Sequence, residues 1–323
     1  MSKTNSGNAM QQQTIPIRIV GTGAYAPGEP ISTAQVAERT GVELDSARLE
    51  EKLGIKYRHI ARLSHADETS ADFAEKAARQ ALEDADVDAS DVGLFIVGSD
   101  TPEYISPSTA VLLQGRLQEG HRQAMSFDIN TSCAGFVTAL DTAARTIAGN
   151  PGIKYALVLG VYNMPAYVRD DDAFGWSIFA DGAGAVVIRR AGDGEASSYK
   201  AGVFESDGTQ WDYVGVYAGG TKRPVTPEVL ESGEYGLQLL QRLPGDRNVK
   251  LWPPLVSRVL EAGGMSQPDV SHFIFTQINK SVITQVMDIL GEDMSKTTTV
   301  MDRYGYTGSG CVPMALHHAI KDG

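Results

Sequence analysis

The chain is poor in cysteine, in positive charge and in long apolar segments, and each shortage argues against a class of protein. Its two cysteines, Cys133 and Cys311, lie far apart and in no metal-ligand spacing. This pattern argues against a disulfide framework or a metal site and indicates a reducing compartment. We therefore expect a cytoplasmic protein without a bound metal.

Basic residues are outnumbered, with 28 Lys and Arg against 40 Asp and Glu and a net charge of −12. This balance argues against broad nucleic-acid binding, which needs clustered positive charge to neutralise phosphates. No apolar run reaches the ~20 residues that a membrane span requires. Residues 1–14 are polar and lack the apolar core of a signal peptide, so we predict a disordered tail there.

Strand and helix patterns alternate through the first half of a chain that is 42% hydrophobic and contains 34 glycines. Predicted strands cover 15–25, 92–98, 155–161 and 180–190, and predicted helices cover 69–85 and 107–118. This alternation predicts an α/β protein whose strands pair in parallel between covering helices. Residues 56–59 (KYRH) form a local basic cluster, read either as a solvated surface or as a phosphate contact.

Residues 126–140 (SFDINTSCAGFVTAL) read as a buried strand that turns at Cys133 and continues directly into a helix. The unpaired N–H groups and the positive dipole end of a first helical turn stabilise a thiolate, which predicts a lowered pKa for Cys133. Such a thiolate is a nucleophile. The stretch alone leaves open the alternative of a buried, inert cysteine.

The second half of the chain repeats features of the first. Leu82-Glu83 and Asp91-Val92 recur as Leu260-Glu261 and Asp269-Val270, displaced by 178 positions in both cases. Farther on, Thr131 matches Thr307 at a displacement of 176. The order and spacing indicate an internal duplication with a pseudo-twofold axis. The turn at 306–310 should therefore meet the turn at Cys133 at the centre of the molecule.

Several motifs, in order along nearly the whole chain, resemble those of the thiolase-fold condensing enzymes, most closely β-ketoacyl-acyl-carrier-protein synthase III. They are VGTGAYAP and GIKYRHIA near the start, FDINTSCAGFVTAL around Cys133, KYALVLG at 154–160 and FADGAGAVVI at 179–188. The resemblance implies a five-layered αβαβα fold built from two duplicated halves, here 15–190 and 191–323. It also implies a homodimer, with an acyl group carried as a thioester on Cys133.

The family completes its site with a His and an Asn from the second half, and this chain departs from both. The His position in the segment FTQIN is occupied by Thr276, and the Asn position in the segment YGYT is occupied by Tyr306. Their hydroxyls can donate hydrogen bonds, but Thr276 cannot act as a base near neutral pH. We expect Cys133, Thr276 and Tyr306 to form the catalytic site, with the two hydroxyls as an oxyanion site. Cys311 is expected to serve in helix packing.

The resemblance also indicates where a thioester substrate binds. The family's Arg and Trp around the coenzyme A nucleotide correspond to Lys52 and Arg48, and Asn279 lies in the segment that follows the His position. No permanently bound cofactor is implied, because coenzyme A or phosphopantetheine enters as a thioester substrate. Family members continue past 312–321 into a final hairpin, which this sequence apparently lacks in its second half.

Two functions remain open at this stage. The first is an acyltransferase of fatty-acid-related or specialised metabolism, which loads an acyl group from acyl-CoA or acyl-carrier protein onto Cys133. The acyl group then passes to a second substrate, by ketosynthase-like condensation or by transfer to an oxygen or nitrogen nucleophile. The second is a catalytically degenerate subunit that partners an active condensing enzyme. The replaced His and Asn favour this reading, and the retained cysteine motif counts against it.

Overall fold

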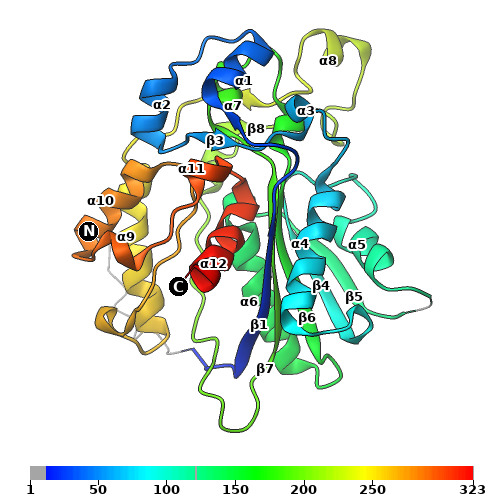
Figure 1. The fold of residues 1–323 in the computed structure, drawn as a ribbon, viewed down its shortest axis with the longest axis vertical. Coiled ribbons are helices and arrows are strands. Elements are labelled where there is room, and N and C mark those ends of the chain that lie inside the picture. The colour runs from blue at the N-terminus through cyan, green and yellow to red at the C-terminus, as the bar shows by residue number, and fades with distance from the viewer. Residues whose placement is uncertain (1–11, 121, 323) are drawn as a thin grey trace.

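The computed structural model describes residues 12–120 and 122–322, which form a mixed α/β fold (Figure 1). The strands are β1 (Ile17–Tyr25), β2 (Ile31–Ser32), β3 (Tyr57–Arg58), β4 (Val92–Gly98), β5 (Met125–Ile129), β6 (Tyr155–Tyr162), β7 (Gly182–Arg190), β8 (Val214–Gly215) and β9 (Gln238–Leu239). The helices are α1 (Thr33–Thr40), α2 (Ser46–Leu53), α3 (Ala61–Ser64), α4 (Ser70–Ala85), α5 (Thr109–Leu117), α6 (Gly135–Gly149), α7 (Ala173–Ile178), α8 (Pro227–Glu231), α9 (Arg247–Ala262), α10 (Lys280–Leu290), α11 (Met301–Tyr304) and α12 (Cys311–Lys321).

The first half of the chain forms a five-stranded sheet in the order β1-β7-β6-β4-β5. The pairs β4–β5 and β4–β6 are parallel, as expected. The prediction of all-parallel pairing is wrong for β7, which runs antiparallel to both β6 and β1. The segment between β6 and β7 contains the short helix α7 and makes no crossover to the other end of the strands. Strand β7 therefore starts where β6 ends and runs back beside it.

Helices cover both faces of this sheet, as Figure 1 shows. On one face, alanines of α4 and leucines of α5 pack against β4, β6 and β7 in a fully buried cluster. On the other face, α6 packs against the strand residues whose side chains point to that face, and Val312 and Leu316 of α12 join this cluster. Because α12 belongs to the second half and packs directly on β7 and β1, the two halves share one core.

The second half is less regular than the first. Strands β8 and β9 form a two-stranded antiparallel sheet there, and Phe273 and Thr297 meet in an isolated parallel bridge. Helices α9 and α10 pack over Phe273 and Phe275 as the outer layer. The side chain of Gln277 is buried between the segments of Phe273 and Thr297 and takes the place of some of the hydrogen bonds that a regular sheet would form. Its amide donates to the carbonyls of Phe275 and Thr298, and its oxygen accepts from the Val300 N–H. The side chain thus satisfies backbone groups that a regular sheet would pair.

Local sequence signals account for many element ends. Helix α1 begins at a capping box formed by Ser32 and Gln35, and α4 begins at one formed by Thr69 and Asp72. Helix α2 ends at Gly54, which adopts the left-handed conformation with φ 78°. The predicted tail lies mostly outside the described residues. Gln12, inside the predicted bounds, is hydrogen-bonded to the Ala262 and Gly202 carbonyls, and the extent of the tail stays a prediction.

The described residues contain no helix that combines the length and the apolar character needed to cross a membrane. Within the same residues, no three His, Cys, Asp or Glu side chains are grouped so that they could hold a metal ion. Strand β7 ends at Arg190, where the boundary between the two halves was predicted. The division into 15–190 and 191–323 stays a prediction.

Close backbone contact between the end of β4 and the start of α6 yields a test of the fold. A methyl group at Gly98 would lie 2.3 Å from the Gly135 carbonyl carbon, whereas one at Gly115 in α5 would meet nothing within 4 Å. We expect Gly98→Ala to lower the free energy of unfolding by about 1–3 kcal/mol because of overpacking. The control Gly115→Ala should raise it by up to ~1 kcal/mol, because alanine favours a helix.

Urea unfolding of the two variants and the parent chain measures both effects. Equal stability of the two variants would contradict the contact between β4 and α6.

Candidate active site

Cys133 lies in a short 3-10 turn, η2 (Ser132–Ala134), between strand β5 and helix α6. Ser132 adopts a left-handed conformation with φ 46°, which is rare for a residue other than glycine. Such strain persists only where surrounding contacts hold it, and it is commonly found at functional sites. The predicted order of strand, sharp turn and helix is confirmed, with α6 beginning two residues after the cysteine. The sequence predicts a buried strand, but β5 is half-buried and Met125 is exposed, because β5 lies at the edge of the sheet.

The turn that follows Tyr306 has the same build. Gly308 has φ 43°, begins the 3-10 turn η7 (Gly308–Gly310), and corresponds to Ser132 at the displacement of 176. Helix α12 follows η7 as α6 follows η2. The Ser309 hydroxyl donates to the Ser132 carbonyl at 2.8 Å. The prediction that the two turns meet is therefore confirmed.

Tyr306 and Thr276 reach the cysteine in a chain of hydrogen bonds. The Tyr306 hydroxyl donates to the Cys133 sulfur at 2.6 Å, and the Thr276 hydroxyl donates to the Tyr306 oxygen at 3.2 Å. The structure thus brings the three expected residues together. It places them in line rather than with both hydroxyls on the sulfur, because Thr276 touches Tyr306 and not Cys133.

The backbone around Tyr306 explains its position. The Tyr306 N–H donates to the Ile178 carbonyl and its own carbonyl accepts from the Ala180 N–H, in a parallel bridge centred on Phe179. The ring is buried and packs near those of Tyr162 and Phe179. These contacts fix the phenol against the sulfur.

Cys311 is the first residue of α12 and is fully buried. Its sulfur contacts the Thr276 hydroxyl at 3.4 Å, accepts from the Gln277 N–H at 3.3 Å and donates to the Gly308 carbonyl at 2.9 Å. Burial raises the pKa of the Cys311 thiol to about 12, so it stays neutral. Besides the expected packing in the helix, Cys311 contacts the Thr276 hydroxyl and so helps to position it.

The expected low pKa of the Cys133 thiol is wrong in direction. Although Cys133 is an exposed residue, the protein atoms around its sulfur desolvate the thiolate and raise the pKa, and the negative charge of Asp100 raises it further. The hydrogen bond from Tyr306 and the positive charge of Arg247 lower it by less. The helix terminus therefore does not outweigh desolvation here.

The residues expected to bind coenzyme A lie on two adjoining helices. Arg48 and Lys52 are exposed on α2, and Asn279 is the N-cap of α10. The Asn279 side-chain oxygen accepts from the Ser281 and Val282 N–H groups, so only its amide nitrogen is available to a ligand. The binding role of all three stays a prediction.

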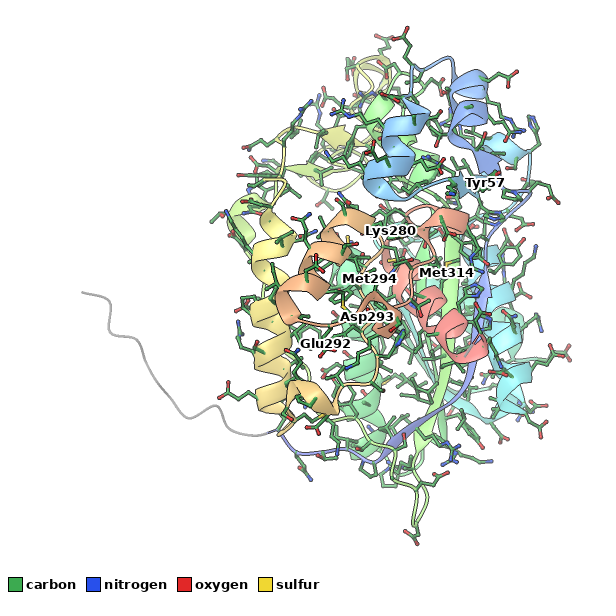
Figure 2. All side chains as sticks on the ribbon, turned by 60° about the vertical axis from the view of Figure 1, so that its left-hand side comes forward. Tyr57, Lys280, Glu292, Asp293, Met294 and Met314 are labelled. Atoms are coloured by element: carbon green, nitrogen blue, oxygen red, sulfur yellow. The ribbon has the colours of Figure 1, made fainter. Side chains whose placement is uncertain are left out.

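A surface hollow lies between these helices and is lined by acidic and basic side chains. Lys280, the first residue of α10, is labelled in Figure 2. The lining comprises Glu50, Glu51, Gly54, Lys56, Lys280, Ser281, Thr284, Gln285 and Asp302. The basic cluster predicted at 56–59 does not form a patch. Arg58 is fully buried, where it donates to the Trp176 carbonyl and the Thr33 hydroxyl, and His59 bonds the Pro27 and Gly28 carbonyls.

The sequence interpretation missed two charged residues that act on the cysteine. Asp100 comes two residues after β4, and its position after a strand that neighbours β5 was a usable signal. Arg247 begins α9, more than a hundred residues from Cys133, and no local pattern indicates that it faces the site. Both alter the Cys133 pKa, in opposite directions.

The chain matches the model of 3-oxoacyl-[acyl-carrier-protein (ACP)] synthase III over residues 127–208 and that of its C-terminal region over 260–323. It is 33% identical over 315 residues to the beta-ketoacyl-[acyl-carrier-protein] synthase III of Xylella fastidiosa, covering 95% of this chain and 90% of that protein.

Two solved structures extend the comparison. The 3-oxoacyl-(acyl carrier protein) synthase III of Pseudomonas aeruginosa PAO1 superposes with a TM-score of 0.81 at 26% identity, covering 95% of this chain and 90% of that one. The priming β-ketosynthase of the R1128 polyketide biosynthetic pathway superposes with a TM-score of 0.79 at 25% identity, covering 96% and 89%. The thiolase-like α/β fold expected from the motifs is confirmed.

The hydrogen bond between Tyr306 and Cys133 yields a test of the site's electrostatics. We expect the Cys133 thiol to titrate above its ordinary pKa of about 8.5. Tyr306→Phe removes the bond that favours the thiolate, so its pKa should rise further and alkylation by iodoacetamide at pH 8 should slow about tenfold.

Peptide-mapped alkylation rates between pH 6 and pH 11 measure this pKa. The matched control Tyr304→Phe removes a hydroxyl that bonds His318 and should leave the rate unchanged. Equal or faster alkylation of Tyr306→Phe would contradict the assignment.

Proposed function

The chain belongs to the 3-oxoacyl-[acyl-carrier-protein] synthase III family of thiolase-fold acyltransferases, and on that premise we propose that Cys133 carries the acyl group. The acyl group comes from a coenzyme A or acyl-carrier-protein thioester and passes to a second substrate. The observation that carries the proposal is the placement of Cys133 on a strained turn before α6, with a phenol donor at 2.6 Å from its sulfur. No bound cofactor takes part in this scheme.

Acylation needs a nucleophile and donors for the tetrahedral oxyanion. The Cys133 sulfur attacks the thioester carbonyl, and the new oxyanion accepts from the Tyr306 hydroxyl and from the Cys133 N–H. Thr276 acts through Tyr306, since its hydroxyl donates to the phenol oxygen. Thr276 is therefore a positioning residue in this step.

The second step has two candidate classes of acceptor, a carbon nucleophile from a malonyl thioester and an oxygen or nitrogen nucleophile. Decarboxylative condensation needs donors on the oxygen of the extender thioester, and the Thr276 hydroxyl is already engaged with Tyr306 and Cys311. This arrangement favours transfer to an oxygen or nitrogen nucleophile over carbon–carbon bond formation. Products formed from malonyl thioesters and from amine or alcohol acceptors, measured side by side, distinguish the two.

A specific observation also supports the second candidate, a degenerate subunit that partners an active condensing enzyme. The buried Tyr306 ring occupies the space against the sulfur, and its hydroxyl is bonded to it. An obligate heterodimer whose activity survives Cys133→Ala would favour this candidate over acyl transfer.

Intact-mass measurement after incubation with acyl-CoA or acyl-carrier protein tests the acyl-enzyme. We expect one acyl adduct on the parent chain and none on Cys133→Ala. Tyr306→Phe should acylate on the order of 10²–10³ times more slowly after correction for the thiolate fraction, because an oxyanion donor is lost. Thr276→Val, which removes only a bond to Tyr306, should cost about tenfold or less.

An adduct that persists in Cys133→Ala, or equal rates in the Tyr306 and Thr276 variants, would contradict these roles.

We further propose that two copies of the chain associate through the edge of the sheet at β5. Among the described residues this strand pairs only with β4. Met125 in β5 and Val137 in α6 are 51% and 39% exposed. Unpaired strand edges with apolar neighbours are pairing surfaces. The Cys133 turn follows β5, so association would also shield the nucleophile.

Light scattering coupled to gel filtration should report twice the 34.6 kDa chain mass. Met125→Lys places a charge at the proposed contact and should shift the chain to the monomer. The control Ile320→Lys changes an exposed apolar residue of α12 and should leave the dimer intact. A monomeric parent chain would overturn the proposal.

A further inference from the structure

A buried carboxyl group lies beside the nucleophile turn without a role in the site described above. Asp100 follows the end of β4 by two residues. Its Oδ1 atom is buried and has no hydrogen-bond partner among the described residues, and the Ser132 side chain hydrogen-bonds to the carboxyl group. Buried polar atoms are almost always satisfied, so an unpartnered carboxylate oxygen next to a nucleophile calls for an explanation.

The sheet places this carboxyl group there. Strands β4 and β5 are parallel neighbours, with Gly98 paired to Ile129, so the segments that follow them leave the same edge of the sheet. The Ser99 N–H donates to the Ile129 carbonyl at 3.0 Å and joins the two segments. Residue 100 and the turn at Cys133 therefore lie side by side.

The loop that carries Asp100 is held firmly. The Thr101 N–H donates to the Ser99 hydroxyl at 3.0 Å, and the Thr101 hydroxyl accepts from the Asn163 N–H at 2.8 Å. The Ser70 hydroxyl donates to the Thr101 carbonyl at 2.7 Å. These bonds fix the backbone on both sides of Asp100 and so limit where its side chain can lie.

The site also needs a group that accepts a proton. Cys133 must lose its proton to attack. The phenol of Tyr306 bonds its sulfur, and Tyr162 and Cys311 are further ionisable groups on which its charge acts. Burial raises the pKa of each, so none accepts a proton near neutral pH. His272, which lies near Thr276 in the sequence, bonds the Thr298 hydroxyl instead.

We propose that the Asp100 carboxylate accepts the Cys133 proton during acylation; this rests on the proposed function. The S–H proton moves to the carboxylate as the sulfur–carbonyl carbon bond forms. The bond from that carbon to the leaving thiol's sulfur then breaks, and the departing thiolate takes the proton back from the carboxylic acid. Asp100 ends ionised, and no other reactant is needed.

The charges around the pair support such an exchange. Burial raises the pKa of Asp100, which makes its carboxylate a better base, and its charge raises the pKa of Cys133 in turn. The ionisable groups that exchange charge effects with Asp100 or Cys133 are Tyr162 at the end of β6, Tyr167 in the following turn, Tyr306 before η7, Cys311 in α12 and Arg247 in α9.

Two pH profiles of the unaltered chain test the proposal. One is the rate of acylation by acyl-CoA followed by intact mass, and the other is the rate of iodoacetamide alkylation of Cys133, which reports the thiolate. If Asp100 takes the proton, acylation reaches its plateau at a lower pH than alkylation does. Coincident midpoints would overturn the proposal without any variant.

The variant Asp100→Asn separates a proton acceptor from a merely structural residue. It should slow acylation at pH 7 by about 10²-fold while it speeds alkylation, because the thiol loses a neighbouring negative charge. Its acylation profile should then coincide with its alkylation profile. A structural defect would slow both reactions, and parallel changes of the two rates would overturn the proposal.

Asp181→Asn is the matched control. Asp181 is also fully buried, also carries a carboxylate oxygen without a partner among the described residues, and accepts from the Ala61 N–H. Its acylation rate should match that of the parent chain. If the parent chain forms no adduct at all, the proposed function fails; if it forms one and Asp100→Asn behaves like the control, only the role of Asp100 fails.

Discussion

The hydrogen bond from Ser309 to the Ser132 carbonyl joins two turns of the same build, and the site depends on this contact. Each turn contains a left-handed residue, Ser132 in one and Gly308 in the other, and each leads into a helix on the same face of the sheet. The approach is so close that a methyl group on Gly135 would lie 2.8 Å from the Ser309 oxygen. Tyr306, directly before the second turn, is thereby brought onto the sulfur at the first.

The same close approach sets the electrostatics of the site. The buried turn η7 packs against the Cys133 turn, and desolvation of the Cys133 sulfur raises its pKa despite the helix that follows. A nucleophile that is mostly a thiol needs a base as well as oxyanion donors. Tyr306 is suited to be an oxyanion donor and Asp100 to be the base. In this chain, where Thr276 stands at the family's His position, these two residues therefore share the work of the site.

Much of this arrangement could be predicted from the sequence, because its signals are local or repeated. The turn at Cys133 follows from a strand pattern that runs into a helix pattern, and the meeting of the turns follows from the duplicated spacing of Thr131 and Thr307. The direction of β7, the burial of Arg58 and the raised pKa of Cys133 could not be predicted in this way. Each depends on which distant segments pack together, and the KYRH cluster shows that charge in the sequence does not imply charge at the surface.

The most direct test of the central claim is the stoichiometry of thiol release when the protein meets an acyl-CoA in the absence of any acceptor. A covalent acyl-enzyme on Cys133 predicts a burst of one free coenzyme A per chain, followed by little further release. The absence of a burst would contradict the acyl-enzyme and favour a subunit that has lost its chemistry. Continued release without a burst would point to hydrolysis that does not pass through an accumulating acyl-cysteine.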